Sequence, residues 1–412
     1  MDKKPEKLVP EVRFKGFTDD WEQRKFLDEI DSIIDYRGKT PKKLGMSWSK
    51  TGYLALSALN VKNGWIDKES NDSHFGNQAL YDIWMKSTPL YKGQVVFTTE
   101  APMGNVAQIP DNEKYILSQR TIAFNPSQRL IDGFLADLLS TKKIQNELMS
   151  LATGGTAKGV SQKSLKFLKI AFPNTEEQNF IHKVIKLLQT FITLQQRKLR
   201  QLKQLKMVML QQLFVDKNNQ QPNLRFKKFN GNWELHKLGD VILDYKKKNN
   251  NDLLPVLTSS FQGIEYQEKH FGSKQKHDTS DYNVLPKEYM TYRNRSDNGY
   301  FRFNINKLGI IGIVSKFYPV FTTINTNKQF LASYLNYNPR LKNYFKVVSV
   351  GTSQHVLSLK NFKKTNLLFP SKSEQDKIGD FFNLLNKIIF LQQNKLTQLT
   401  TLKKYLLQKM FI

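Results

Sequence analysis

The sequence predicts an α+β protein, in which two mixed α/β globular parts in a pseudo-twofold arrangement are joined by two long antiparallel coiled-coil helices. Three observations predict this fold. A short segment recurs at one constant offset, a longer segment that closes each half recurs at a second offset, and the stretches between them do not match. Similar frames around dissimilar interiors indicate one architecture that carries two different recognition surfaces.

The first repeat opens each half of the chain. Residues 10–30 match residues 222–242, with ten of 21 positions identical. The identical positions include three pairs of large or charged residues: Arg13 and Arg225, Phe14 and Phe226, Trp21 and Trp233. The same plan therefore begins twice.

The second repeat closes each half and has the pattern of a helix. Residues 176–214 match residues 373–411, with 18 of 39 positions identical. Each segment follows a proline and offers a capping box. The predicted box residues are Thr175 with Gln178 and Ser371 with Glu374. A Gly-Thr dipeptide also precedes each segment, at residues 155–156 and 351–352.

Both closing segments carry a seven-residue apolar repeat, which is typical of a coiled coil. The apolar members of the row are Ile181, Leu188, Leu202 and Met209 in one segment and Ile378, Leu385, Leu399 and Leu406 in the other. Gln195 and Gln392 interrupt the row at its midpoint, so antiparallel helices about 58 Å long would bring the two amides together. The alternatives are that each helix packs only on its own globular part, and that the two Gln residues face solvent or a partner.

The globular parts contain both strand and helix patterns. The predicted strands are residues 95–99, 121–124, 309–314 and 319–323, and the predicted helices are residues 134–151 and 329–335. The polar stretch 216–222 marks the join between the halves. The predicted domains are residues 1–175 and 218–372, with helix and linker at 176–217 and the second helix at 373–412.

Charge and composition restrict the class of protein. Lys and Arg number 63 and Asp and Glu 36, a net charge of +27. Such an excess indicates a polyanionic partner, although part of it is consistent with an AT-rich genome. The absence of cysteine excludes disulfides and Cys-ligated metals. The N-terminus has no signal-peptide pattern and no apolar run is long enough to span a membrane, so we expect a cytoplasmic protein with no membrane association.

The motifs of nucleotide, methyl-transfer and metal chemistry are incomplete. Gly38-Lys39-Thr40 resembles the end of a phosphate loop, but Ile33 stands where that loop needs glycine. Asn125-Pro126-Ser127 lacks the second proline and the aromatic residue of an amino-methyltransferase motif. The histidines are scattered. We therefore predict no catalytic residues and no metal site, and the basic charge favours nucleic-acid binding.

Two loop regions combine cations with side chains that suit base edges. Arg pairs with guanine and Asn or Gln with adenine in the major groove, although each residue could equally lie in a solvated loop. The candidate DNA-binding residues are Arg37, Lys39, Thr40, Lys42, Lys43, Gln119 and Arg120 in the first half and Arg293, Asn294, Arg295 and Ser296 in the second.

These features together resemble the specificity subunit of a type I restriction–modification system over essentially the whole chain. The resemblance rests on the duplicated Arg-Phe-x-x-Phe…Trp-Glu entry, on residues 92–99 (KGQVVFTT), and on the Gly-Thr…Phe-Pro…Glu-Gln exits. It implies two target-recognition domains that each read half of a split double-stranded DNA site, and a helical spacer that fixes the gap. It also implies two methylation subunits and two restriction subunits, with S-adenosylmethionine, ATP and magnesium on those partners and no cofactor on this chain.

Two other classes of protein are alternatives. A stand-alone DNA-modifying enzyme would bind its cofactor in the isolated chain. A nonspecific coiled-coil DNA adaptor would bind random duplexes as well as any specific one.

Overall fold

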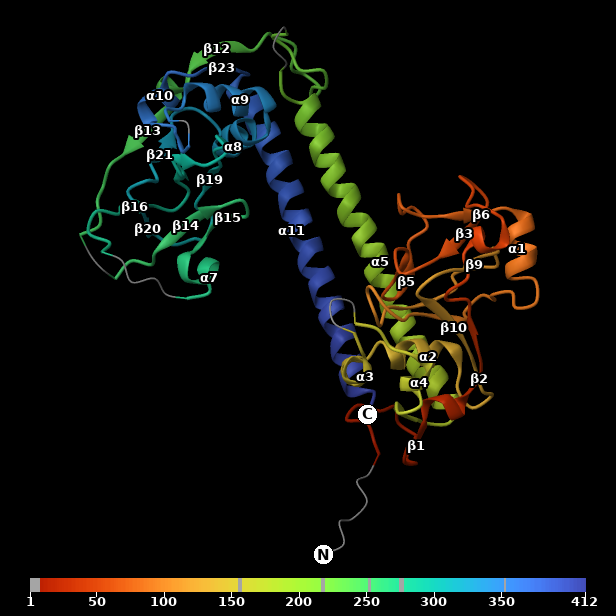
Figure 1. Cartoon of the computed structure of the whole chain (residues 1–412). Coiled ribbons are helices and arrows are strands. Elements are labelled where there is room, and N and C mark those ends of the chain that lie inside the picture. Colours follow the sequence, from red (N-terminus) through yellow and green to blue (C-terminus); the bar gives the residue numbers. More distant parts are fainter. Residues whose placement is uncertain (1–7, 155–157, 216–218, 251–252, 274–277, 352) are drawn as a thin grey trace, which may run out of the picture. The chain divides into compact units, whose positions relative to one another are not determined.

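The computed structural model describes residues 8–412 except 155–157, 216–218, 251–252, 274–277 and 352 (Figure 1). Gly155, Thr156, Thr352 and the start of the predicted linker therefore lie outside the described residues. The chain divides into two compact units, residues 1–195 with 395–412 and residues 196–394. Each unit contains one globular part and a segment of both long helices, and each is described by itself.

The first unit is organised around an antiparallel four-stranded sheet with the order β2-β10-β7-β8. Its strands are β2 (Ile30–Asp35), β10 (Thr121–Pro126), β7 (Val95–Thr98) and β8 (Val106–Gln108). β7 pairs along its whole length with the first four residues of β10, from Thr98 with Thr121 to Val95 with Phe124. Both strands predicted in this half are therefore confirmed.

Smaller elements complete the first unit. The remaining strands are β1 (Glu22–Lys25) paired with β11 (Lys169–Phe172), β3 (Tyr53–Leu56) between β6 (Phe75–Gly76) and β9 (Ile116–Leu117), and β4 (Val61–Lys62) with β5 (Trp65–Ile66). The helices are η1 (Phe26–Glu29), η2 (Pro41–Leu44), α1 (Gln78–Trp84), α2 (Asp132–Leu139), α3 (Lys142–Leu151) and α4 (Gln162–Leu165).

The second unit repeats the four-stranded plan with the order β13-β21-β17-β19. Its strands are β13 (Ile242–Tyr245), β21 (Val320–Thr323), β17 (Met290–Tyr292) and β19 (Phe303–Ile305). As in the first unit, a two-stranded ribbon joins the start and the end of the globular part, here β12 (Glu234–Lys237) with β23 (Asn366–Phe369). Two sheets with the same order confirm that each half has the same architecture.

The other elements of the second unit differ from those of the first. The strand pairs are β14 (Leu257–Ser260) with β15 (Gly263–Tyr266), β16 (Asn283–Leu285) with β20 (Gly312–Val314), and β18 (Arg295–Ser296) with β22 (His355–Val356). The helices are α6 (Leu238–Val241), α7 (Gln267–Phe271), α8 (Lys328–Tyr337), α9 (Pro339–Val348) and α10 (Leu359–Lys363). The predicted strands at 309–314 and 319–323 correspond to β20 and β21.

The helix predicted at 134–151 is two helices. It breaks at Thr141, which has an extended backbone and accepts a hydrogen bond from the Ile144 amide on its Oγ1. A Ser-Thr pair precedes α3, and side chains of this kind compete with helical backbone hydrogen bonds and favour N-caps.

The two long helices are α5 (Thr175–Gln212) and α11 (Lys372–Lys409). Ser371 caps α11 as predicted, because its Oγ accepts a hydrogen bond from the Glu374 amide at 3.4 Å. The predicted cap at Thr175 is wrong. Asn174 holds that position and accepts from the Glu177 amide at 2.9 Å, so Thr175 is already helical. No helix within the described ranges is long and apolar enough to cross a lipid bilayer.

Within each unit the segments of α5 and α11 pack antiparallel to each other. In the first unit Ile181 and Ile185 near the start of α5 share a core with Leu406 and Leu407 near the end of α11. In the second unit the order is reversed, and Leu210 late in α5 shares a core with Ile378 and Phe382 early in α11. The antiparallel prediction is confirmed at this level.

The predicted contact between Gln195 and Gln392 stays a prediction. Gln392 is buried and Gln195 is half-buried, and they belong to different units. Their approach to one another is therefore left to experiment.

The repeated sequence residues build the same aromatic core twice. Trp21 packs edge-on against Phe134 at 5.8 Å and against Phe411 at 6.2 Å between ring centroids. In the second unit Trp233 packs in the same way against Phe330 at 5.9 Å and Phe214 at 6.3 Å. Each trio joins the opening repeat, the first helix after the sheet and the end of a long helix, so it fixes the globular part to the helix pair.

A buried ion pair repeats beside each trio. Arg13 donates from Nε and Nη2 to both carboxylate oxygens of Glu177 at 2.7 Å. Arg225 does the same to Glu374 at 2.8 and 2.7 Å. The hydrogen bond to Glu177 raises the pKa of Arg13 above its ordinary value. This forked geometry is specific to arginine and carboxylate, which explains why the opening repeat keeps arginine in both halves.

Candidate DNA-recognition loops

The basic loop of the first half follows β2 and is stabilised from within. The Arg37 side chain donates to both oxygens of Asp35, at 2.9 Å from Nε and 2.5 Å from Nη2. Burial alone would raise the pKa of Asp35, but the hydrogen bonds from Arg37 and Gln162 outweigh it and lower that pKa. Arg37 is therefore committed to an internal pair and orients the loop.

The four other loop residues serve partly to shape a turn. Thr40 is the N-cap of η2, and Lys43 donates from Nζ to the carbonyl of Gly38 at 2.6 Å. Lys39 lies over the ring of Tyr36, 4.3 Å from its centroid. Lys39, Lys42 and Lys43 are exposed, which leaves them accessible to phosphates.

Gln119 and Arg120 form an exposed turn directly before β10. Arg120 has a φ of 64°, which is uncommon for a residue other than glycine. Its Nε lies 3.2 Å from a carboxylate oxygen of Glu100, and both side chains are about half exposed. Such an exposed pair is weak enough to exchange for a phosphate or base contact.

The candidate loop of the second half runs through β18. Arg293 is exposed and makes no hydrogen bond or ion pair with any described residue. Arg295 lies over the ring of Phe317, 3.9 Å from its centroid. Ser296 donates to the Asn298 amide oxygen at 2.9 Å. The Asn294 Oδ1 is buried without a hydrogen-bond partner in the described chain, so this carbonyl points inward.

Arg293 and Arg295 line a cavity of about 610 Å³ that the sequence did not indicate. Five further basic or aromatic side chains line it, together with the carboxylate of Glu265: Phe261, Lys269, His270, Tyr300 and Arg302. Its wall includes the turn of the β14–β15 hairpin, where the Phe261 ring is 81% exposed. The sequence Phe261-Gln262-Gly263 between two short strand patterns could have predicted that turn. Its position beside the arginines follows only from the fold.

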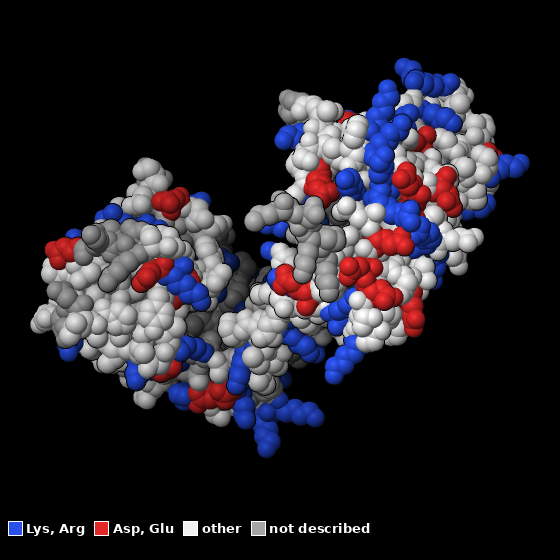
Figure 2. Space-filling model, turned by 90° about the horizontal axis from the view of Figure 1, so that it is seen from below, with Lys and Arg blue, Asp and Glu red and all other residues white. Residues whose placement is uncertain are grey.

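The basic charge of the chain lies on its surface. In Figure 2, Lys and Arg side chains form a band over the globular part on the right, with Asp and Glu side chains beside them. This mixture differs from a uniformly cationic face.

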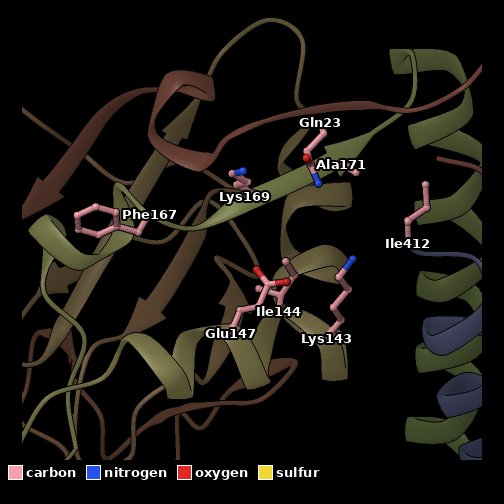
Figure 3. Close-up of a pocket in the computed structure, with 8 residues that line it drawn as sticks. All are labelled: Gln23, Lys143, Ile144, Glu147, Phe167, Lys169, Ala171 and Ile412. Atoms are coloured by element: carbon pink, nitrogen blue, oxygen red, sulfur yellow. The ribbon is translucent and has the colours of Figure 1, made fainter. Parts of the chain in front are cut away.

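A smaller cavity of about 250 Å³ lies between the β1–β11 ribbon and α3 in the first unit. Figure 3 shows Lys143 and Glu147 from α3 and Lys169 from β11 around it, with Ile412 at the side. One carboxylate among two lysines gives no arrangement for acid–base or metal chemistry. Within the described ranges, no cluster of three metal-ligating side chains is present either.

The comparison with protein families decides the identity of this architecture. The family model described as the type I restriction modification DNA specificity domain matches residues 18–204 and again residues 230–401. This chain belongs to that family. Recognition of a DNA target in a type I restriction–modification system is accordingly its role.

The specificity-domain fold also occurs in solved structures. The chain is similar to the S subunit of a type I restriction–modification system from M. genitalium, with a TM-score of 0.60, 17% identity, and coverage of 98% of this chain and 99% of that one. It is also similar to the HsdS subunit from Thermoanaerobacter tengcongensis, at a TM-score of 0.42 and 14% identity over 100% and 99% of the two chains. The search of curated proteins finds no match.

The two arginines of the second loop, Arg293 exposed and Arg295 half-buried, carry a testable prediction. We expect Arg293→Ala and Arg295→Ala each to weaken binding of the recognised duplex. Loss of a base contact should cost about 1–3 kcal/mol and relax one position. Loss of a phosphate contact should weaken all duplexes alike and reduce the salt slope by about one.

Fluorescence anisotropy over a range of salt concentrations measures both quantities. Lys198→Ala, an exposed lysine of α5, is the matched control and should leave both unchanged. Arginine variants with unchanged affinity and salt slope would place this loop off the DNA.

Proposed function

We propose that this chain reads a bipartite double-stranded DNA site, with one half-site read by each globular part. The observation that carries the proposal is the repeat itself. The two parts share their sheet order, aromatic trio and buried ion pair, yet the sequences between the repeats, which contain the candidate loops, do not match. Two domains that recognise different DNA sequences need the same scaffold with different loops, and this is the arrangement of the two globular parts. The long helices would then set the gap between the half-sites.

We propose further that the chain positions other subunits and performs no chemistry itself. Two methylation subunits would bring S-adenosylmethionine, and two restriction subunits would use ATP and magnesium. The interrupted motifs at Gly38-Lys39-Thr40 and Asn125-Pro126-Ser127 support this division of labour. A complex of this composition would act in the cytoplasm, where the DNA lies.

The purified chain separates these proposals from an enzyme or a nonspecific adaptor. Supplied with S-adenosylmethionine, ATP and magnesium, it should neither methylate nor cut DNA, while its binding to the recognised duplex should resist competition by random duplexes. Turnover would identify a stand-alone enzyme. Equal competition by random duplexes would identify an adaptor without sequence preference.

A further inference from the structure

The second unit contains a cavity that is lined by cations and by no acidic residue. It has a volume of about 660 Å³ and lies between the globular part and the helix pair, entirely within residues 196–394. Its lining includes Lys206 from α5, Arg302 and Lys307 beside β19, and Ser333 and Tyr337 from α8. Three cations line it and no Asp or Glu does.

Two of the cations converge on one phenol oxygen. Lys206 Nζ donates to the Tyr337 hydroxyl oxygen at 2.9 Å, and Arg302 Nη2 donates to the same atom at 3.2 Å. Both cations also lie over the Tyr337 ring, 4.6 and 5.1 Å from its centroid. Burial raises the pKa of Tyr337, but the two cations outweigh it and lower that pKa.

These groups retain unused hydrogen-bonding capacity. The Tyr337 oxygen accepts two hydrogen bonds, so its own proton is left to donate elsewhere. The Nε of Arg302 is buried and has no hydrogen-bond partner in the described chain. None of the three cations forms an ion pair with a carboxylate among the described residues. Lys206 and Arg302 are half-buried, and partly buried cations without a counterion are costly.

The first half has a carboxyl group near the equivalent lysine. Lys206 and Lys403 are equivalent in the closing repeat, 197 residues apart. Burial lowers the pKa of Lys403, and the carboxylate of Asp137 on α2 partly opposes that effect. Asp137 also lies 2.9 Å from His182 Nδ1. Lys403 itself donates to the Gln189 side-chain oxygen at 2.8 Å and forms no ion pair among the described residues, so Asp137 acts on it only at longer range.

The second half has no carboxyl group at the equivalent position. Gln178 accepts a hydrogen bond from the Ile131 amide just before α2, and its equivalent Gln375 accepts one from the Asn327 amide just before α8. These equivalent contacts align α2 with α8 at an offset of 196 residues. At the place of Asp137 this offset puts Ser333, which lines the cavity. His182 is replaced by Gly379, where any Cβ would collide with the Asn327 amide. The acidic group is missing on one side only, and space remains in its place.

We propose that this cavity binds a phosphate group, which supplies the negative charge that the cations lining it lack among the described residues. Lys206, Arg302 and the Tyr337 hydroxyl are the donors. The phosphate belongs either to a free nucleotide or to the backbone of bound DNA, and the chemistry of the donors is the same for both. The site does not depend on whether the chain reads a split target.

Titration of the full-length chain with inorganic phosphate at constant ionic strength tests the proposal. Thermal unfolding and calorimetry should show saturable binding to the wild type and at least about tenfold weaker binding to Arg302→Gln. Lys403→Gln is the matched control, because it removes the equivalent charge from the first half, and it should bind phosphate like the wild type.

The substitution Ser333→Asp places a carboxylate in the cavity, at the position equivalent to Asp137. This variant should lose phosphate binding, whereas Ser333→Asn, of the same size but neutral, should keep it. Absence of saturable phosphate binding in the wild type, or equal binding by wild type and Arg302→Gln, would overturn the proposal. The Arg302→Gln comparison decides the matter even if Ser333→Asp does not fold.

Two further measurements distinguish the sources of phosphate. If the source is DNA, Arg302→Gln should reduce the salt slope of binding to a random duplex by about one. If the source is a nucleotide, ADP should bind more tightly than inorganic phosphate and the duplex salt slope should be unchanged. Equal phosphate and ADP affinities with an unchanged salt slope would contradict both sources, and would leave free inorganic phosphate as the ligand.

Discussion

Replacement of Arg225 by Met should destabilise the second unit by about 3–5 kcal/mol, because it leaves a buried carboxylate without its partner. The Glu374 side chain is 1% exposed, and both of its oxygens accept hydrogen bonds from Arg225. Arg13→Met should have a similar effect on the first unit, since the Glu177 side chain is fully buried in the equivalent pair. Urea unfolding followed by fluorescence measures the loss.

The chain provides a control for this prediction two residues before Glu374. Lys372 pairs with Asp376 at 2.5 Å, but the two side chains are 51% and 42% exposed. Lys372→Met should therefore cost at most about 1 kcal/mol. The double variant Arg225→Met, Glu374→Leu should recover most of the loss, because it removes the buried charge. An Arg225→Met variant as stable as Lys372→Met would show that the pair does not hold the globular part to its helix.

Exchange of residues 10–175 for the equivalent part of another family member should change one half of the recognised site completely and leave the other half intact. The aromatic trio and the ion pair attach each part to the helices through residues of the repeat, so a foreign part with the same repeat should dock in the same way. Methylation mapping in cells that contain the partner subunits reads both half-sites at once. The reciprocal exchange of residues 218–372 should change the other half.

The modular account makes a sharp distinction between these outcomes. One changed half-site in each chimera, and a different one in the two chimeras, is the expected result. If either exchange altered both half-sites together, the two parts would not be independent readers.

The opening segments and the two long helices could be predicted from the sequence because both are repeated in it. Trp21 and Trp233, or Arg13 and Arg225, could be recognised as structural because the same residue recurs at a fixed offset. The two long helices were predictable to within a residue of their starts for the same reason. What failed locally was the cap of α5, where Asn174 takes the position predicted for Thr175.

The candidate DNA contacts could not be resolved in the same way. Arg37 looked like a free cation in the sequence, but Asp35, two residues earlier, accepts its hydrogen bonds. Arg302 carried no signal at all, since its neighbours Lys206 and Tyr337 come from distant segments. Side chains in loops acquire their roles from contacts between segments, and a pattern along one chain does not contain those contacts.

Methylation mapping of cells with and without this chain is the most direct test of the central claim, that one chain reads two separate half-sites. With the chain and its partner subunits present, the methylated sequences should share a split motif with two defined halves and a gap of fixed length. Deletion of the chain should abolish methylation at that motif. A continuous motif, a variable gap, or methylation that persists without the chain would contradict the account.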